Sequence, residues 1–318
     1  MLDTEASHTP RTSVIIPSYN YAEYLPAAIA SVLAQSDSDL ELLVVDDGST
    51  DGSVAIAQAF PDPRVRVFVR PHRGRAAPRN TGMRAAHGRY IAFLDADDIW
   101  VQDKLAVQCE ALDRLPDVGL VYSRFGVIDA VGRLQSRGRS YLAAKPSGAI
   151  LRHLLEGNVI GTPSTICFRR DLVENNGLWF DETNTHRDDW HFYLRVAARS
   201  RIHYLPRTLA YHRYHTRNTQ GNVPARMTES LCTVQFGLDL ALECFGLSGR
   251  ELQRVERRAL AYVEAIAGRE YAKAGKLTLA RGHAARSLKH YPWNVREATL
   301  YLLASIGWVP QAITRRLK

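Results

Sequence analysis

Short apolar runs alternate with amphipathic segments along the first third of the chain. Each run has five to seven residues and ends at polar or glycine-containing positions, which is typical of a buried strand. The segments between the runs repeat apolar residues every three or four positions, the period of an α-helix. We expect strands at 13–17, 40–45, 65–69 and 88–94, and helices at 22–35, up to about 60, at 78–86 and at 103–115. This alternation predicts an α/β fold with a mostly parallel sheet and helices on both faces.

The remaining two thirds of the chain have a different pattern. We expect strands at 118–122 and 162–168, a hairpin through 125–134, a polar loop at 136–147 and a short helix at 148–156. From about Ala225 the composition shifts to Ala, Leu, Arg and Glu. Four amphipathic helices are predicted there, at 228–245, 250–273, 277–291 and 295–306. The pattern therefore predicts an α/β part followed by a C-terminal helical region.

Polar residues follow three of the predicted strands at the point where each strand ends. Pro17-Ser18-Tyr19-Asn20 follows the first strand, Asp46-Asp47 the second, and Asp95-Ala96-Asp97-Asp98 the fourth. The carboxyl ends of parallel strands meet at one edge of the sheet, where such folds bind ligands. Carboxylates that cluster there repel one another unless a counter-charge is present. A divalent cation that carries the phosphates of a nucleotide would supply that charge.

Four of these segments, in this order and spacing, resemble a known family. VIIPSYNYAEYLPAAIASVLAQ, LLVVDDGSTDGS, APRNTG and GRYIAFLDADD are similar to the nucleotide-sugar half of bacterial family 2 glycosyltransferases. The resemblance covers about residues 12–220 and implies the GT-A fold, a Rossmann-like, mostly parallel sheet with helices on both faces. It divides the chain into an N-terminal tail (1–11), a nucleotide-sugar-binding half (12–115), an acceptor-binding half (116–224) and a C-terminal helical region (225–318).

The resemblance also implies which residues bind the donor nucleotide. Pro17, Tyr19 and Asn20 would line the nucleobase pocket, with Tyr19 packed on the base. The base or the ribose would donate hydrogen bonds to Asp46 and Asp47. Two further residues, Arg79 and Asn80, would lie near the diphosphate or brace the acidic loop. The segment that contains Arg79 and Asn80 and the residues just before it depart from the family pattern at two positions, His72 and Pro78.

The Asp-x-Asp motif, with Ala96 at its centre, carries the implied metal site. Asp95 would face the ribose or the sugar, and Asp97 would bind the Mn²⁺ or Mg²⁺ that bridges the diphosphate. Asp98 would be a supporting partner. Farther along the chain, Tyr211-His212-Arg213-Tyr214-His215 resembles the Tyr-Arg-x-His segment of the family. His215 is therefore a further candidate metal ligand or phosphate contact.

A second part of the site is expected at Arg187-Asp188-Asp189-Trp190, where an amphipathic helix begins. Helix dipoles favour negative charge in the first turn, so both aspartates could serve the helix alone. The segment also resembles the Glu-Asp-Trp segment of the family, with Asp188 in place of Glu. The resemblance implies that Asp189 removes the proton of the acceptor hydroxyl in an inverting displacement. Asp188 is the weaker candidate for this catalytic role.

Composition adds an expectation about location. Lys and Arg (41) exceed Asp and Glu (33) by eight, but they are scattered, with the last hundred residues Arg-rich. This distribution does not favour a nucleic-acid groove and leaves an anionic membrane surface open. The four cysteines form no CxxC pair, and neither a signal peptide nor a spanning segment is evident. We expect a cytoplasmic protein. Two interpretations of residues 298–314 stay open: helix packing, which is favoured, and peripheral contact with the inner face of the membrane.

The expected function is sugar transfer. The donor would be a nucleotide-diphospho-sugar, with a UDP-sugar expected, and the acceptor a saccharide or lipid-linked glycan of the cell envelope. Two alternatives stay open. A nucleotidyltransferase acting on sugar phosphates also gathers carboxylates around a metal, but usually has a Gly-rich basic loop where this chain has Pro-Ser-Tyr-Asn. The other alternative is a non-catalytic protein that binds nucleotide-sugars or serves as a scaffold.

Overall fold

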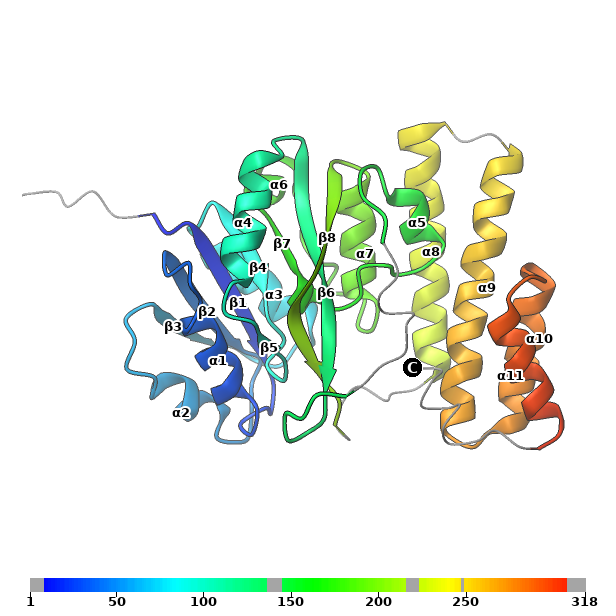
Figure 1. Ribbon diagram of the computed structural model, residues 1–318, viewed down its shortest axis with the longest axis horizontal. Coiled ribbons are helices and arrows are strands. Elements are labelled where there is room, and N and C mark those ends of the chain that lie inside the picture. The colour runs from blue at the N-terminus through cyan, green and yellow to red at the C-terminus, as the bar shows by residue number, and fades with distance from the viewer. Residues whose placement is uncertain (1–8, 136–144, 216–222, 247–248, 308–318) are drawn as a thin grey trace, which may run out of the picture.

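The computed structural model describes residues 9–135, 145–215, 223–246 and 249–307. Its centre is an eight-stranded sheet in the order β3-β2-β1-β4-β7-β6-β8-β5, with the C-terminal helices beside it (Figure 1). The α/β fold class with a C-terminal helical region is confirmed. Three predicted segments lie wholly or partly outside the described residues, namely the N-terminal tail, the polar loop at 136–147 and the membrane segment at 298–314.

The first half of the sheet is parallel, as the alternating pattern predicts. β1 (Thr12–Ser18) lies between β2 (Leu40–Asp46) and β4 (Tyr90–Phe93), and β3 (Val65–Val69) pairs with the other side of β2. β2 and β4 are buried along their whole length, and β1 is buried except at Pro17, which is partly exposed. Strands covered on both faces carry continuous apolar runs, and these runs explain why the positions of β1, β2 and β4 can be predicted from the sequence.

Alternate residues of β1 belong to two cores, one on each face of the sheet. Val14 and Ile16 pack in the core formed with α1 (Leu25–Leu33), α2 (Ser53–Gln58) and α4 (Lys104–Arg114). Ile15 packs in the opposite core, formed with α3 (Ala76–Ala85) and α7 (Asp188–Ala197). The two-residue period of a strand thus fixes α3 and α7 on the same face. This placement brings residues of both helices to one end of the sheet.

The second half of the sheet mixes parallel and antiparallel strands. β7 (Ile166–Arg169) is antiparallel to β4 and to β6 (Val118–Ile128), while β8 (Arg201–Arg213) is parallel to β6. β5 (Ile99–Trp100) pairs antiparallel with β8. The hydrophobic pattern indicates neither β5 nor β8, because β5 has two residues and β8 is rich in polar ones. Short helices connect these strands: α5 (Leu151–Leu155), η2 (Pro163–Thr165) and α6 (Asp171–Asn176).

The four predicted C-terminal helices are confirmed. α8 (Val223–Phe245) and α9 (Gly249–Lys273) pack against α5, and α8 also packs against α7. Val234, Leu238 and Val255 are buried in the same core as Ile15 of the central strand. α10 (Leu277–His290) and α11 (Val295–Ser305) form the outermost layer (Figure 1). Across the described ranges, none of the helices has the length and hydropathy required to cross a membrane.

We predict that Gly88→Ala destabilises the junction between α3 and β4. A Cβ at position 88 would lie 2.4 Å from the backbone nitrogen of Ser13 and 2.7 Å from the carbonyl carbon of Thr12. Because strand backbone cannot move aside cheaply, we expect the free energy of unfolding to fall by about 2 kcal/mol. Urea denaturation measures this change. Gly52→Ala is the matched control, since its Cβ would meet only Ile56 at 4.0 Å. Equal stability of the two variants would contradict the prediction.

Candidate active site

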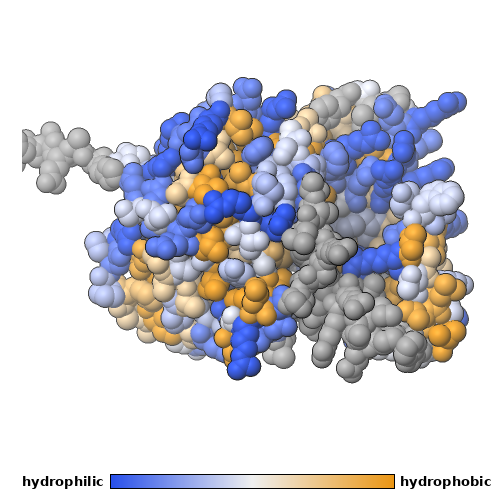
Figure 2. All heavy atoms as spheres, viewed as in Figure 1, coloured by the Kyte–Doolittle hydropathy of each residue, from blue (hydrophilic) through white to orange (hydrophobic). Residues whose placement is uncertain are grey.

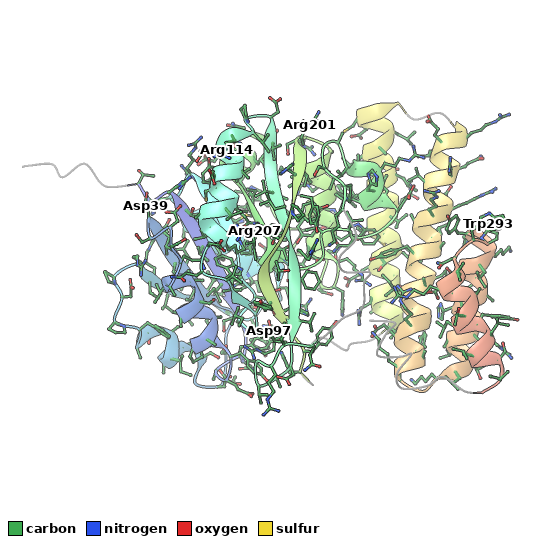
Figure 3. The ribbon with its side chains drawn as sticks, viewed as in Figure 1. Asp39, Asp97, Arg114, Arg201, Arg207 and Trp293 are labelled. Carbon is green, nitrogen blue, oxygen red and sulfur yellow. The ribbon has the colours of Figure 1, made fainter. Side chains whose placement is uncertain are left out.

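A cavity of about 790 Å³ opens at the carboxyl ends of the parallel strands. Figure 3 labels Asp97 at this end of the sheet. The walls include the loops after β1, β2, β3 and β4, the starts of α3 and α7, and single turns of α8 and α9. The predicted site residues that line the cavity are Pro17, Tyr19, Asn20, Asp47, Arg79, Asp95, Ala96, Asp97, Asp188 and Asp189. Asp46, Asn80 and His215 are buried and are not among its lining residues.

The turn after β1 carries an exposed aromatic ring into the cavity. Tyr19 is 40% exposed, and its ring stacks on the imidazole of His72 with centroids 4.0 Å apart. Asn20 has a positive φ of 57°, and its side-chain carbonyl accepts a hydrogen bond from the backbone nitrogen of Thr50 at 2.8 Å. The turn is therefore locked to the loop after β2. It presents a flat ring of the kind on which a nucleobase stacks.

The two aspartates after β2 are held by the protein itself. Asp46 accepts hydrogen bonds from the backbone nitrogens of Gly48 and Ser49, so its carboxylate closes its own turn. Asp47 pairs with Arg70 at 2.6 Å and accepts hydrogen bonds from the backbone nitrogens of Arg73 and Gly74. Of the two, only Asp47 lines the cavity. The structure thus gives Asp46 a role in shaping the loop and leaves Asp47 in reach of a ligand.

The Asp-x-Asp motif places its two outer carboxylates in different surroundings. Asp95 pairs with Arg79 at 2.9 Å and accepts a hydrogen bond from Thr162 Oγ1 at 3.1 Å. Asp97 is 6% exposed, and its Oδ2 lies 3.0 Å from Nε2 of His215. Burial alone would raise the pKa of Asp97. The hydrogen bond with His215 and the charge of a second histidine, His212, hold it below its ordinary value.

Asp98 anchors the motif to β8. Its carboxylate accepts hydrogen bonds from Ser164 Oγ at 2.6 Å and from the backbone nitrogen of Arg213 at 2.9 Å. Nδ1 of His212 lies 3.0 Å from the same carboxylate. Burial raises the pKa of Asp98. Burial lowers the pKa of His212, but Asp98 outweighs this effect and raises it to about 9, so His212 carries a positive charge at neutral pH.

Arg79 connects the motif to the start of α7. Its buried guanidinium forms ion pairs with both Asp95 and Asp188. Burial lowers the pKa of Arg79, but the nearby carboxylates raise it above its ordinary value, so the charge is permanent. The adjacent Asn80 donates a hydrogen bond to the carbonyl oxygen of Phe180 at 2.9 Å and accepts one from its backbone nitrogen. Asn80 thus braces the segment that leads to α7.

Asp188 and Asp189 differ in what their carboxylates contact. Asp188 is 1% exposed and is committed to Arg79. Asp189 accepts a hydrogen bond from the backbone nitrogen of Trp190 at 2.7 Å and a longer one, 3.3 Å, from Asn158 Nδ2. Burial and the charge of Asp188 raise the pKa of Asp189 to about 6, against the lowering effect of Arg79 and Arg187. A carboxylate with such a pKa suits proton transfer near neutral pH.

Comparison with known proteins identifies the family. Residues 13–177 match the family described as Glycosyl transferase family 2. An uncharacterized glycosyltransferase of Nostoc sp. is 30% identical over 250 residues, which is 72% of this chain and 73% of the relative. The chain belongs to glycosyl transferase family 2. This assignment favours a glycosyltransferase over both alternatives, the nucleotidyltransferase and the non-catalytic binding protein.

Two kinds of relative add detail on this glycosyltransferase. The Escherichia coli protein WfgD, named UDP-Glc:alpha-D-GlcNAc-diphosphoundecaprenol beta-1,3-glucosyltransferase, is 31% identical over 60% of this chain and 71% of the relative. Among solved structures, S. aureus TarS 1-349 in complex with UDP-GlcNAc has a TM-score of 0.62 at 17% identity, covering 95% of this chain and 93% of TarS. A Pyrobaculum calidifontis mannosyltransferase with GDP-Man and Mn²⁺ has a TM-score of 0.54 at 23% identity, covering 94% and 87%. These two structures support the fold.

The sequence does not predict that several further residues line the glycosyltransferase cavity. Some lie between motifs, where no pattern marks them, and others come from the helical region. They are Phe125, Thr162, Arg226, Glu270 and Lys273. Arg187 and His212 also line the cavity, and each stands in a segment that resembles the family.

We predict that Arg79→Met lowers the free energy of unfolding by about 3 kcal/mol at pH 7, because the buried carboxylate of Asp188 and the partly buried one of Asp95 lose their cation. The loss should shrink at pH 4.5, where protonation removes the uncompensated charge. Denaturant unfolding at both pH values measures it. Arg84→Met is the matched control, an exposed arginine on the same helix, and Asp188→Asn in the Arg79→Met background should recover part of the stability. A pH-independent loss would contradict this explanation.

Proposed function

We propose that this glycosyltransferase moves a sugar from a UDP-sugar to a saccharide or lipid-linked glycan acceptor, with inversion at the anomeric carbon. The observation that carries the proposal is Asp189, a carboxylate with a raised pKa at the wall of the cavity that also contains the Asp-x-Asp motif. The name of the E. coli relative and the UDP-GlcNAc complex of TarS support the donor class. The same relative supports an acceptor of the cell envelope.

In this proposal the nucleoside of the donor occupies the part of the cavity formed by the turn after β1 and the loop after β2. The Tyr19 ring stacks on the base, in the place where it now contacts His72. Asp47, buried and oriented by Arg70, accepts hydrogen bonds from the base or ribose. Asp95, fixed by Arg79 and Thr162, faces the ribose or sugar. These groups are already held in place, so binding requires little reordering of side chains.

The residues around Asp97 fit a divalent cation. Its carboxylate and the His215 imidazole lie at hydrogen-bond distance, and both are deeply buried beside the acidic motif. Within the described residues no group of three or more His, Cys, Asp or Glu side chains could hold a metal, so the diphosphate and water would supply the other ligands. We propose that Asp97 holds Mn²⁺ or Mg²⁺, with His215 and Asp95 as further candidate ligands. Bound there, the ion would neutralise charge on the departing diphosphate.

Asp189 is the proposed general base. The acceptor hydroxyl gives its proton to a carboxylate oxygen of Asp189 as the hydroxyl oxygen attacks the anomeric carbon, and the bond to the diphosphate breaks. The backbone nitrogen of Trp190 and Nδ2 of Asn158 orient that carboxylate. Asp188 acts indirectly, because it is bound to Arg79 and its charge raises the pKa of Asp189. One base suffices for a displacement that inverts the anomeric centre.

We predict that the rate of sugar transfer rises with pH to a plateau above pH 7, with a midpoint near 6, because Asp189 must be ionised to accept a proton. Asp189→Asn should lower the rate by about 10²–10⁴-fold while leaving donor affinity unchanged. A pH profile of kcat/KM measures both effects. Asp171→Asn, at an exposed acid, is the control. A profile that stays flat between pH 5 and 7 would exclude Asp189 as the base.

The raised pKa of Asp189 makes stability fall over the pH range in which activity rises. Because the pKa of Asp189 is higher in the folded than in the unfolded protein, folding favours its protonated form. The stability that this group contributes is present at low pH and is lost as the pH rises to about 6. Asp189→Asn should therefore have a higher Tm than the parent protein at pH 8, and the difference should disappear near pH 4.

We predict that UDP-sugars raise the Tm when Mn²⁺ or Mg²⁺ is present and have a much smaller effect with EDTA, because a ligand that binds only the folded state stabilises it. Asp97→Asn should abolish the metal-dependent part of the shift. The same samples should release UDP slowly from a UDP-sugar by hydrolysis and release no pyrophosphate from UTP. Pyrophosphate release would support the nucleotidyltransferase alternative. A thermal shift that is the same with EDTA would contradict the metal site.

We also propose that the outer helices contact the membrane surface. Apolar side chains are exposed on α11 and the turn before it: Trp293 is 82% exposed, and Val295, Leu302 and Ile306 are exposed as well. Figure 2 shows apolar side chains gathered at this outer end of the molecule. Arg281 and Lys289 on α10 are exposed nearby in sequence and add positive charge. Such a combination binds anionic membranes.

We predict that the protein co-sediments with vesicles that contain anionic phospholipid and that Trp293→Ser with Leu302→Ser reduces the bound fraction severalfold. The control is Val69→Ser, at an exposed apolar residue of β3. Equal binding of the double variant and the control would exclude this surface.

A further inference from the structure

A cluster of cationic side chains forms the wall of the cavity beside Asp189. Arg187 directly precedes α7, Arg226 lies in the first turn of α8, Lys273 ends α9, and Arg75 directly precedes α3. We call these four residues the cationic wall. Their segments are far apart in the sequence, so the fold, and not a local run of basic residues, brings them together. Arg187 belongs to the segment quoted above for its resemblance to Glu-Asp-Trp, and the other three lie outside the quoted family motifs.

The members of the cationic wall are close enough to influence one another. Arg187 donates a hydrogen bond from Nε to Ser230 Oγ of α8 at 2.7 Å, which fixes it against the helix that carries Arg226. Burial lowers the pKa of Arg226, and the charges of Arg187 and Arg75 lower it further. Like charges in such proximity destabilise the protein, so a purely structural role does not explain why three guanidiniums converge here.

Glu270 offsets part of this charge. It lies 2.5 Å from Lys273 Nζ and 3.9 Å from Arg226 Nη1, which ties α9 to α8. Among the described residues that line this part of the cavity, the four cations face the carboxylates of Glu270, Asp188 and Asp189, and Asp188 is already paired with Arg79. The wall therefore keeps a net positive charge next to the proposed base. A phosphate group carries the complementary charge and can accept several hydrogen bonds from guanidinium groups.

We infer that the cationic wall binds a phosphate group of the acceptor, and that the acceptor is therefore a glycan linked through phosphate to its carrier. This inference rests on the proposed function, because it takes Asp189 as the group that receives the acceptor hydroxyl. Arg187 lies close enough to Asp189 to lower its pKa, so an acceptor held by the wall has its sugar at the base. The donor diphosphate belongs instead to the motif around Asp97. Helices α8 and α9 thus supply acceptor recognition.

The test uses the full chain saturated with UDP and Mn²⁺, so that the donor site is filled and its occupancy is measured first. Octyl diphosphate, inorganic pyrophosphate and octyl glucoside are then titrated by calorimetry. We expect octyl diphosphate to bind at least tenfold more tightly than octyl glucoside. Arg226→Gln and Lys273→Gln should each weaken octyl diphosphate binding about tenfold, the effect of losing a charge-assisted hydrogen bond.

The matched control is Arg254→Gln, an exposed arginine of α9 about 24 Å along the helix from Glu270. It should bind octyl diphosphate as the parent protein does. UDP affinity measured on every variant reports both folding and the donor site. Tighter binding of octyl diphosphate than of pyrophosphate supports a lipid-linked acceptor as the source of the phosphate.

Three outcomes would overturn the inference. They are equal binding of octyl diphosphate and octyl glucoside, no effect of either variant, and loss of UDP affinity in the Arg226 variant. The last outcome would assign the wall to the donor. Failure of the parent protein to bind UDP would contradict the proposed function itself. This failure is distinguished from failure of the inference because UDP binding is measured before any acceptor probe is added.

Discussion

The two halves of the active site depend on one buried guanidinium. Arg79 of α3 lies between Asp95, which follows β4, and Asp188, which begins α7. Asp188 is buried and Asp95 is partly buried, and an unpaired buried charge costs several kcal/mol, so the buried carboxylate in particular depends on this cation. The pairing therefore holds the end of β4 against the helix that carries Asp189. A small shift of α3 would therefore displace Asp95 on one side of the cavity and Asp188 on the other.

The loops around the cavity are organised by the same kind of interaction. The carboxylates of Asp46 and Asp98 accept hydrogen bonds mainly from backbone nitrogens and hydroxyl groups of the protein. Buried polar groups need such partners, because leaving them unsatisfied is costly. Part of the acidic character of the site thus serves to fix its shape. Asp47, Asp95, Asp97 and Asp189, in contrast, line the cavity, where a substrate can reach them.

The sequence predicts the parallel strands and the four C-terminal helices, because continuous apolar runs and amphipathic periods mark them directly. It does not indicate β8, whose alternating polar residues give no such run, although β8 positions His212 and Arg213 against Asp98. It also cannot separate the roles of Asp46 and Asp47, which are neighbours with the same chemistry. Their difference comes from which way each side chain turns at the end of β2. The sequence does not indicate that Arg226 and Lys273 line the cavity, because only tertiary packing brings α8 and α9 to the site.

The proposed order of the two roles along the chain, donor binding first and acceptor binding second, has an evolutionary consequence. The family match covers residues 13–177, whereas Asp189 and three of the four residues of the cationic wall come later, Arg75 being within the match. Under the proposed division of roles, recombination near residue 177 would join one donor part to different acceptor parts. The shared core limits such exchange, because Val234 and Leu238 of α8 are buried in the same cluster as Ile15. A new acceptor part would have to bring both its own recognition residues and a helix face that fits the old sheet.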